Sequence, residues 1–92
     1  MSKISKEKQG KIMSDIVDVL YDNSPQAIFT ADISKSIGRD EEFVKKLLQD
    51  MREKGLIVSV VMNPQGKLYT RRMRWRLSAL TYESYKNLHN IQ

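Results

Sequence analysis

The residues best suited to chemistry in this sequence are basic, and they gather in one short segment. Between positions 67 and 76 the chain carries five positive side chains and no acidic one: Lys67, Arg71, Arg72, Arg74 and Arg76. A planar guanidinium donates two parallel hydrogen bonds to a phosphate or a carboxylate, whereas a merely solvated segment usually mixes both signs of charge. The segment therefore predicts contact with a polyanion.

Catalytic and metal-binding chemistry is not indicated. The chain has no cysteine and a single histidine, His89, and it contains no glycine-rich phosphate loop and no grouping of serine, histidine and aspartate. Asp15, Asp18 and Asp22 are spaced along one helix face, which is more typical of a solvated surface than of a cation site. The sequence thus predicts no enzyme, no cofactor and no bound metal.

The bulk composition agrees with an anionic partner. The 92 residues include 16 Lys and Arg against 11 Asp and Glu, which gives a formal net charge of +5. This length suits one domain, and a domain so small favours pairing with a second copy. No apolar run approaches the roughly 20 residues that cross a bilayer, and the polar start lacks the apolar core of a secretory signal. We therefore expect a soluble protein without membrane contact.

The first elements are a basic arm and a helix. Residues 1–11 are polar and predict an arm with four lysines: Lys3, Lys6, Lys8 and Lys11. From Ile12 to Tyr21 the apolar residues recur every three to four positions, as on one buried helical face, and Pro25 ends the helix. We expect the compact domain to begin here and to cover residues 12–92.

Two further helices are predicted around a tight turn. Thr30 offers a hydroxyl to cap a short helix over residues 31–37, and Gly38 supplies the backbone freedom that a helix exit requires. Asp40 is a good N-cap for a longer helix over residues 41–54, which Gly55 ends.

A hairpin and a last helix complete the chain. Residues 56–61 are rich in β-branched side chains, residues 63–66 predict a turn, and the alternating residues 67–77 predict a second strand. One face of this second strand holds Trp75 and is expected to join the core, and the other is cationic. Ser78 can cap a C-terminal helix over residues 79–91, whose apolar side is Leu80, Tyr85, Leu88 and Ile91.

This order of elements resembles the winged helix-turn-helix domain. The framework is similar at residues 30–38, 43–51 and 55–57, and residues 74–78 resemble the strand that leads into the last helix of MarR- and PadR-like regulators. The resemblance covers roughly residues 12–80. It implies an α+β, mostly helical fold with a three-helix core, a β-hairpin wing and a C-terminal helix.

The resemblance also implies where a nucleic acid would bind. In this family the third helix usually enters the major groove and the wing lies on the backbone or in a minor groove. Applied to residues 41–54, this implies DNA contacts by Arg39, Lys45, Lys46 and Gln49. The sequence departs from the pattern at residues 40–42, where three carboxylates favour the helix dipole but repel phosphate; Glu41 or Glu42 is alternatively a reader of cytosine.

We therefore predict a double-stranded DNA-binding transcription regulator that is cytoplasmic and associated with the nucleoid. We expect a homodimer that pairs through its first and last helices, because the last helix has more apolar surface than one small core needs. The alternative is a winged helix module that binds a protein in a transcription or replication complex, which the acidic start of the third helix favours. The five positive charges at residues 67–76 decide for DNA.

Overall fold

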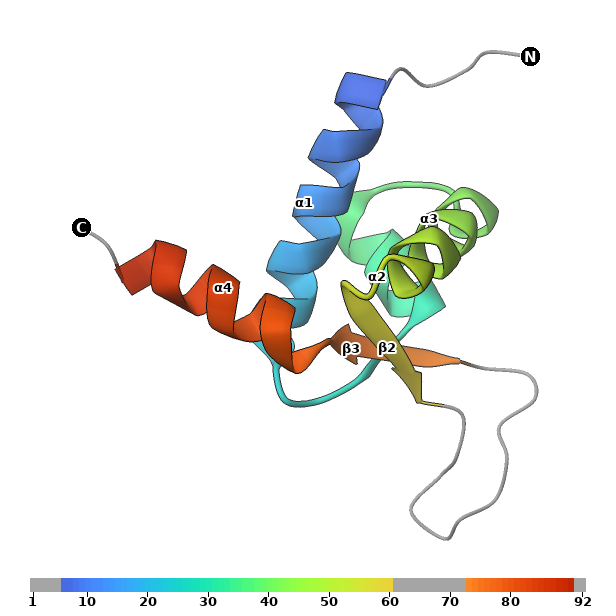
Figure 1. Cartoon of the computed structure of the whole chain (residues 1–92). Coiled ribbons are helices and arrows are strands. Elements are labelled where there is room, and N and C mark those ends of the chain that lie inside the picture. Colours follow the sequence, from blue (N-terminus) through green and yellow to red (C-terminus); the bar gives the residue numbers. More distant parts are fainter. Residues whose placement is uncertain (1–5, 61–72, 91–92) are drawn as a thin grey trace, which may run out of the picture.

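The computed structural model describes residues 6–60 and 73–90, with side chains up to residue 88. These residues form four helices and a three-stranded antiparallel sheet (Figure 1). In chain order the elements are α1 (Lys6–Asn23), β1 (Ile28–Phe29), α2 (Thr30–Ile37), α3 (Glu41–Glu53), β2 (Ile57–Val60), β3 (Arg74–Leu77) and α4 (Ala79–Asn90).

The first helix is longer than its apolar pattern indicates. α1 begins at Lys6, so residues 6–11, which we predicted to belong to a basic arm, are helical. Their lysines and Gln9 are compatible with a helix although they bury little surface, because long unbranched side chains lose little freedom there. The buried residues Ile12, Ile16 and Leu20 lie four positions apart and hold this helix against the domain.

The α2–turn–α3 unit follows the prediction with one correction. Gly38 adopts the left-handed backbone (φ 68°), and the Oδ2 atom of Asp40 accepts from the Phe43 amide at 3.1 Å, which caps α3. Thr30 does not cap α2: it is the first residue of that helix, and its hydroxyl accepts from the Trp75 indole. The cap prediction failed because a local pattern cannot show a partner 45 residues away.

The three strands form one antiparallel sheet in the order β1-β3-β2, with β3 in the centre. Trp75 pairs with Ile28 on one side and with Ser59 on the other. Alternation along β3 is as predicted, since Trp75 and Leu77 are buried and Arg76 is exposed. The predicted turn at residues 63–66 and the first part of the second predicted strand, residues 67–72, lie outside the described residues.

One core connects these elements. Trp75 is fully buried within it, as predicted, and the other buried hydrophobic residues are Ile12, Ile16, Leu20, Ile33, Val44, Leu47, Leu48, Met51, Ile57 and Leu77. They come from α1, α2, α3 and the sheet, and α4 contributes none of them. α4 instead runs from the end of β3 past the lower end of α1 and away from α3 (Figure 1).

The start of α4 is capped as predicted. The Oγ atom of Ser78 accepts from the Thr81 amide at 3.3 Å and donates to the Thr81 hydroxyl at 2.9 Å. Within the described helices, none is long and apolar enough to cross a membrane.

Candidate nucleic-acid interface

The outer face of α3 is the first part of the candidate interface. Lys45 and Lys46 are exposed, Gln49 is half-buried, and Arg39 is exposed in the turn before the helix. The opposite face of α3 packs into the core through Val44, Leu47, Leu48 and Met51. Because burial on one side fixes the rotation of the helix, the two lysines and Gln49 are presented outward together.

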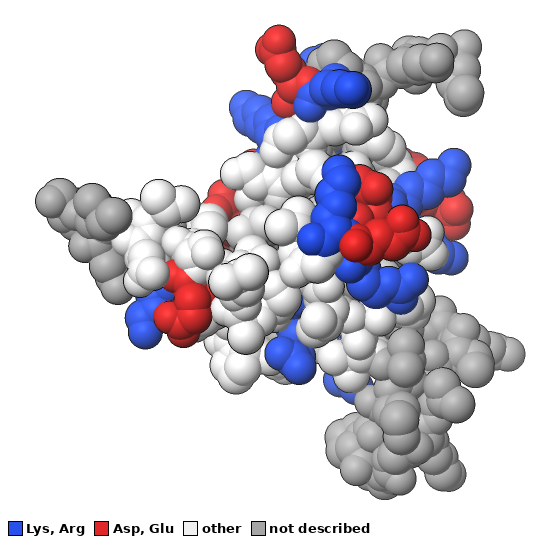
Figure 2. All heavy atoms as spheres, in the orientation of Figure 1, with Lys and Arg blue, Asp and Glu red and all other residues white. Residues whose placement is uncertain are grey.

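Carboxylates share this surface with the lysines. Glu41 and Glu42 are exposed in the first turn of α3, and Asp50 forms an ion pair with Lys54 at 3.1 Å in the last turn. Figure 2 shows acidic and basic side chains interspersed over this part of the molecule. Asp40, by contrast, is engaged in capping the helix. The surface of α3 is therefore mixed in charge. Any strong attraction of this protein for a polyanion would have to come mainly from basic residues outside α3.

The two described arginines of β3 have different surroundings. Arg76 is exposed, whereas Arg74 is half-buried and its guanidinium carbon lies 5.5 Å from the centroid of the Phe29 ring. This distance allows a cation–π contact. The cationic face predicted for this strand is therefore partly covered at Arg74. The other three basic residues predicted for the hairpin, Lys67, Arg71 and Arg72, lie outside the described residues.

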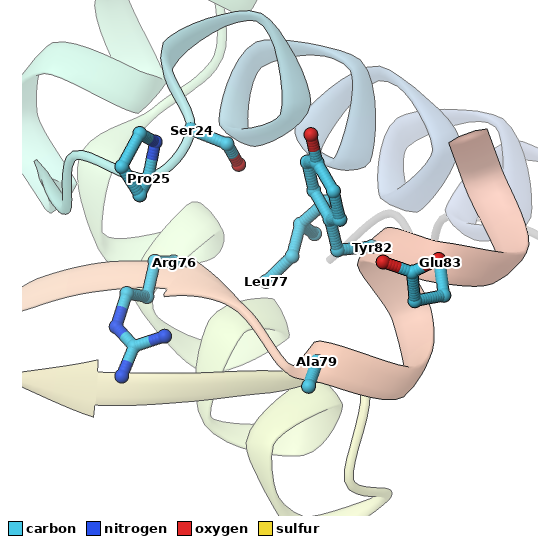
Figure 3. Close-up of a pocket in the computed structure, with 7 residues that line it drawn as sticks. All are labelled: Ser24, Pro25, Arg76, Leu77, Ala79, Tyr82 and Glu83. Carbon is cyan, nitrogen blue, oxygen red and sulfur yellow. The ribbon is translucent and has the colours of Figure 1, made fainter.

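A pocket of about 380 Å³ lies beside Arg76. It sits between the loop after α1, the end of β3 and the first turns of α4, and it is lined by Ser24, Pro25, Arg76, Leu77, Ala79, Tyr82 and Glu83. In Figure 3 the Arg76 guanidinium and the Glu83 carboxylate lie on opposite sides of the Tyr82 side chain. Arg76 therefore lies close to the start of α4.

Arg52 is a basic residue of α3 that the sequence analysis missed. It is exposed, yet its Nη1 atom donates to the Ser59 hydroxyl at 3.2 Å and its guanidinium carbon lies 5.7 Å from the centroid of the Trp75 ring. No spacing in the sequence indicates these contacts, because they join a helix end to two strands. A basic residue in the last turn of a helix ordinarily serves the helix dipole.

The acidic residues of α1 do not form a metal site. In the part of the chain that the structure describes, no group of three or more potential metal ligands is present. Asp22 is exposed, as predicted, but Asp18 is half-buried and accepts a hydrogen bond from the Tyr85 hydroxyl. The prediction that Asp18 points into solvent is therefore wrong, since α4 partly covers this position. The side chain of His89 is outside the described residues.

Comparison with known proteins finds the fold among solved structures. No protein family model and no curated protein matches the sequence. The crystal structure of the S. aureus MepR–DNA complex superposes with a TM-score of 0.69 at 26% sequence identity, over 96% of this chain and 64% of that one. The PcaV transcriptional regulator from Streptomyces coelicolor, in complex with its natural ligand, matches with a TM-score of 0.67 at 17% identity, over 94% and 56% of the two chains.

A mutant of Lactococcus lactis ZitR matches with a TM-score of 0.62 at 20% identity, over 97% of this chain and 57% of that chain. The chain therefore spans less than two thirds of the length of these solved chains. The matches confirm the predicted winged helix fold, α+β and mostly helical, and the predicted resemblance to MarR-like regulators.

Proposed function

We propose that this chain is a double-stranded DNA-binding transcription regulator that places α3 in the major groove. The observation that carries the proposal is the outer face of α3, where Lys45, Lys46 and Gln49 are presented together by a helix whose other face is locked into the core. A helix of this width fits the major groove, where lysine and glutamine side chains reach phosphates and base edges.

The similarity to MepR supports the proposal, because that protein was solved in complex with DNA and shares both the fold and 26% of aligned residues. The role is one of binding rather than catalysis. The alternative function, a module that binds a protein in a transcription or replication complex, is not favoured by these comparisons. A regulator of this kind acts in the cytoplasm, and we include association with the nucleoid in the proposal.

The residues divide into two groups by the contact they would make. Arg39, Lys45 and Lys46 are proposed to bind phosphates or base edges, and Gln49 to bind base edges. The five hairpin residues, Lys67, Arg71, Arg72, Arg74 and Arg76, are proposed to hold the backbone or a minor groove. Together the hairpin residues carry a charge equal to the whole net charge of the chain, so they supply the general attraction that the mixed surface of α3 lacks.

We further propose that two copies pair through α1 and α4. Leu80 and Leu88 are 77% and 69% exposed on α4, a helix that contributes no fully buried residue to the described core, and together they give this helix an exposed apolar side. Figure 2 shows a largely uncharged surface between α1 and α4, so a second copy seated there would bury few charges. A two-fold pair would place its recognition helices about 34 Å apart, one turn of DNA.

The decisive experiment selects bound duplexes from a random DNA pool and then measures affinity for the selected and for a scrambled duplex over a range of salt. Neutralising about five phosphates predicts a slope of log K against log salt of about −4 to −5. Lys46→Ala and Gln49→Ala are expected to change the preference among sequences, whereas Arg72→Ala with Arg74→Ala weakens all duplexes alike.

Lys86→Ala serves as the charge-matched control for Lys46→Ala, because Lys86 is exposed on α4, which runs away from α3 (Figure 1). It is expected to leave both affinities within about twofold, as a distant surface charge is screened. Undetectable binding at low salt, or equal losses from Lys46→Ala and Lys86→Ala, would refute the proposal.

A further inference from the structure

The Trp75 side chain contacts both helices of the α2–turn–α3 unit. It lies in the central strand of the sheet with none of its surface exposed. Its backbone is paired with β1 at Ile28 and with β2 at Ser59, and its ring reaches both helices of the helix-turn-helix unit. Its position therefore joins the base of the hairpin to α2 and α3.

The first of these ring contacts is a hydrogen bond. The Nε1 atom of Trp75 donates to the hydroxyl of Thr30 at 2.8 Å. A buried indole N–H needs a partner, and Thr30 is the first residue of α2, which packs on α3 and leads into it through the turn at Gly38. The bond is directional, so it fixes the ring relative to α2 as apolar packing alone would not.

The second contact reaches the other end of the unit. Arg52, in the last turn of α3, lies with its guanidinium carbon 5.7 Å from the centroid of the Trp75 ring, within range for a cation–π contact. The same guanidinium donates to the Ser59 hydroxyl of β2 at 3.2 Å. The Arg52 guanidinium thus connects α3 to both β2 and β3, and these two contacts constrain its orientation.

We propose that Trp75, held by Thr30 and Arg52, is a positioning residue that keeps α3 in one fixed relation to β2 and β3, the base of the hairpin. This inference rests on the proposed function. Base reading by α3 and backbone binding by the hairpin then occur in a single register on the DNA. If α3 could move relative to β2 and β3, discrimination among DNA sequences would fall before the general affinity for DNA does. A residue that merely filled the core would need neither the indole donor nor the guanidinium.

The test compares conservative changes with matched controls. Trp75→Phe keeps an aromatic ring but removes the donor, Thr30→Val keeps the shape but removes the acceptor, and Arg52→Gln removes the cation. Lys54→Gln is the control for the last change, since Lys54 lies next to the same helix end, carries the same charge and pairs with Asp50 rather than with Trp75.

We expect Thr30→Val, Trp75→Phe and Arg52→Gln each to reduce the ratio of specific to scrambled-duplex affinity by about three- to tenfold, the effect of losing one directional contact. Affinity for the scrambled duplex and its salt slope stay within about twofold, as for Lys54→Gln. Thr30→Val combined with Trp75→Phe loses no more than either change alone, because both break the same bond. Unchanged ratios, or losses that follow thermal stability alone, would overturn the inference.

A measurement without DNA separates this inference from the proposed function. The chain has no cysteine, so spin labels can be attached through cysteines introduced at the exposed positions Glu42 of α3 and Arg76 of β3. The distance distribution between the labels is expected to be narrow in the parent chain and to broaden in Thr30→Val and in Arg52→Gln. If it broadens while the unlabelled parent chain, which keeps Arg76, binds no duplex, only the proposed function fails; if it stays narrow, the positioning role of Trp75 fails even where the unlabelled chain binds DNA.

Discussion

The helices α3 and α4 are of similar length but are attached to the molecule in different ways. α3 buries four residues in the core and turns a polar, charged face outward. In α4, none of the described side chains at residues 79–88 is buried, and two leucines are exposed. The apolar side of α3 is therefore buried within the chain, whereas Leu80 and Leu88 of α4 face outward.

The attachment of α4 explains how its leucines stay exposed. Tyr82 stacks on Tyr21 of α1 with ring centroids 5.2 Å apart, Tyr85 lies tilted against the same ring at 4.6 Å, and the Tyr85 hydroxyl donates to Asp18. The aromatic contacts hold the tyrosine side of α4 against α1, and Asp18 provides the polar partner that the Tyr85 hydroxyl needs. Leu80 and Leu88 lie outside these contacts, and they are the leucines that the proposed pairing of two copies would bury.

The largest expected effect comes from truncating the buried side of α3. Leu48 is fully buried, so Leu48→Ala should lower the free energy of unfolding by about 2–5 kcal/mol, through lost transfer energy and the cavity left behind. Urea unfolding followed by circular dichroism measures this loss. In a domain this small, such a loss is a large fraction of the total stability.

The matched change on α4 is Leu88→Ala, which removes the same atoms from a side chain that is 69% exposed. At a protein concentration low enough to keep the chain monomeric, it should alter the free energy of unfolding by no more than about 0.5 kcal/mol. A loss comparable to that of Leu48→Ala would show that α4 belongs to the monomer core, and the contrast between the two helices would disappear.

The second effect concerns self-association. Leu80→Glu combined with Leu88→Glu places two charges on the exposed aliphatic side of α4 and should weaken dimer formation by about tenfold or more, because burying an unpaired carboxylate costs at least 1–2 kcal/mol. Sedimentation equilibrium over a range of concentrations measures the dissociation constant. Lys45→Glu with Lys46→Glu, on the outer face of α3, is the control and should leave that constant unchanged.

Much of the fold could be predicted because its signals are local. These signals each act over a few positions of the chain. They are the regular spacing of the buried residues in α1, the left-handed backbone of Gly38, and the helix caps formed by Asp40 and Ser78. The outward position of Lys45 and Lys46 follows from the same periodicity, so this part of the candidate site was within reach of the sequence.

What the sequence did not indicate depends on contacts between distant segments. The Thr30 hydroxyl binds Trp75 instead of capping α2, Arg52 lies over the same ring, and Arg74 lies over Phe29. In each case the residue type suits a common local role, and tertiary packing gives it another. Position-based patterns carry no information on which strand will come to lie beside a helix end, so only the folded structure reveals these pairs.

A smaller effect tests how α3 begins. Asp40→Ala removes the acceptor that binds the Phe43 amide at 3.1 Å and should lower the free energy of unfolding by about 1 kcal/mol, the usual contribution of an N-cap. Asp40→Asn keeps an acceptor and should recover most of the loss, which thermal unfolding can measure. Equal destabilisation by both variants would mean that the negative charge near the helix dipole, and not the cap, is what matters.

The smallest effect is expected on the outer face of α3, where Asp50 and Lys54 form an ion pair 3.1 Å apart. Their side chains are 49% and 58% exposed, so solvent screens the attraction, and Asp50→Asn should change the free energy of unfolding by at most about 0.5 kcal/mol. Raising the salt concentration should remove even that difference, because exposed pairs are screened within a Debye length. A loss above 1 kcal/mol that persists at high salt would show that this face stabilises the fold, and it would then be less free to meet a partner than the exposed side of α4.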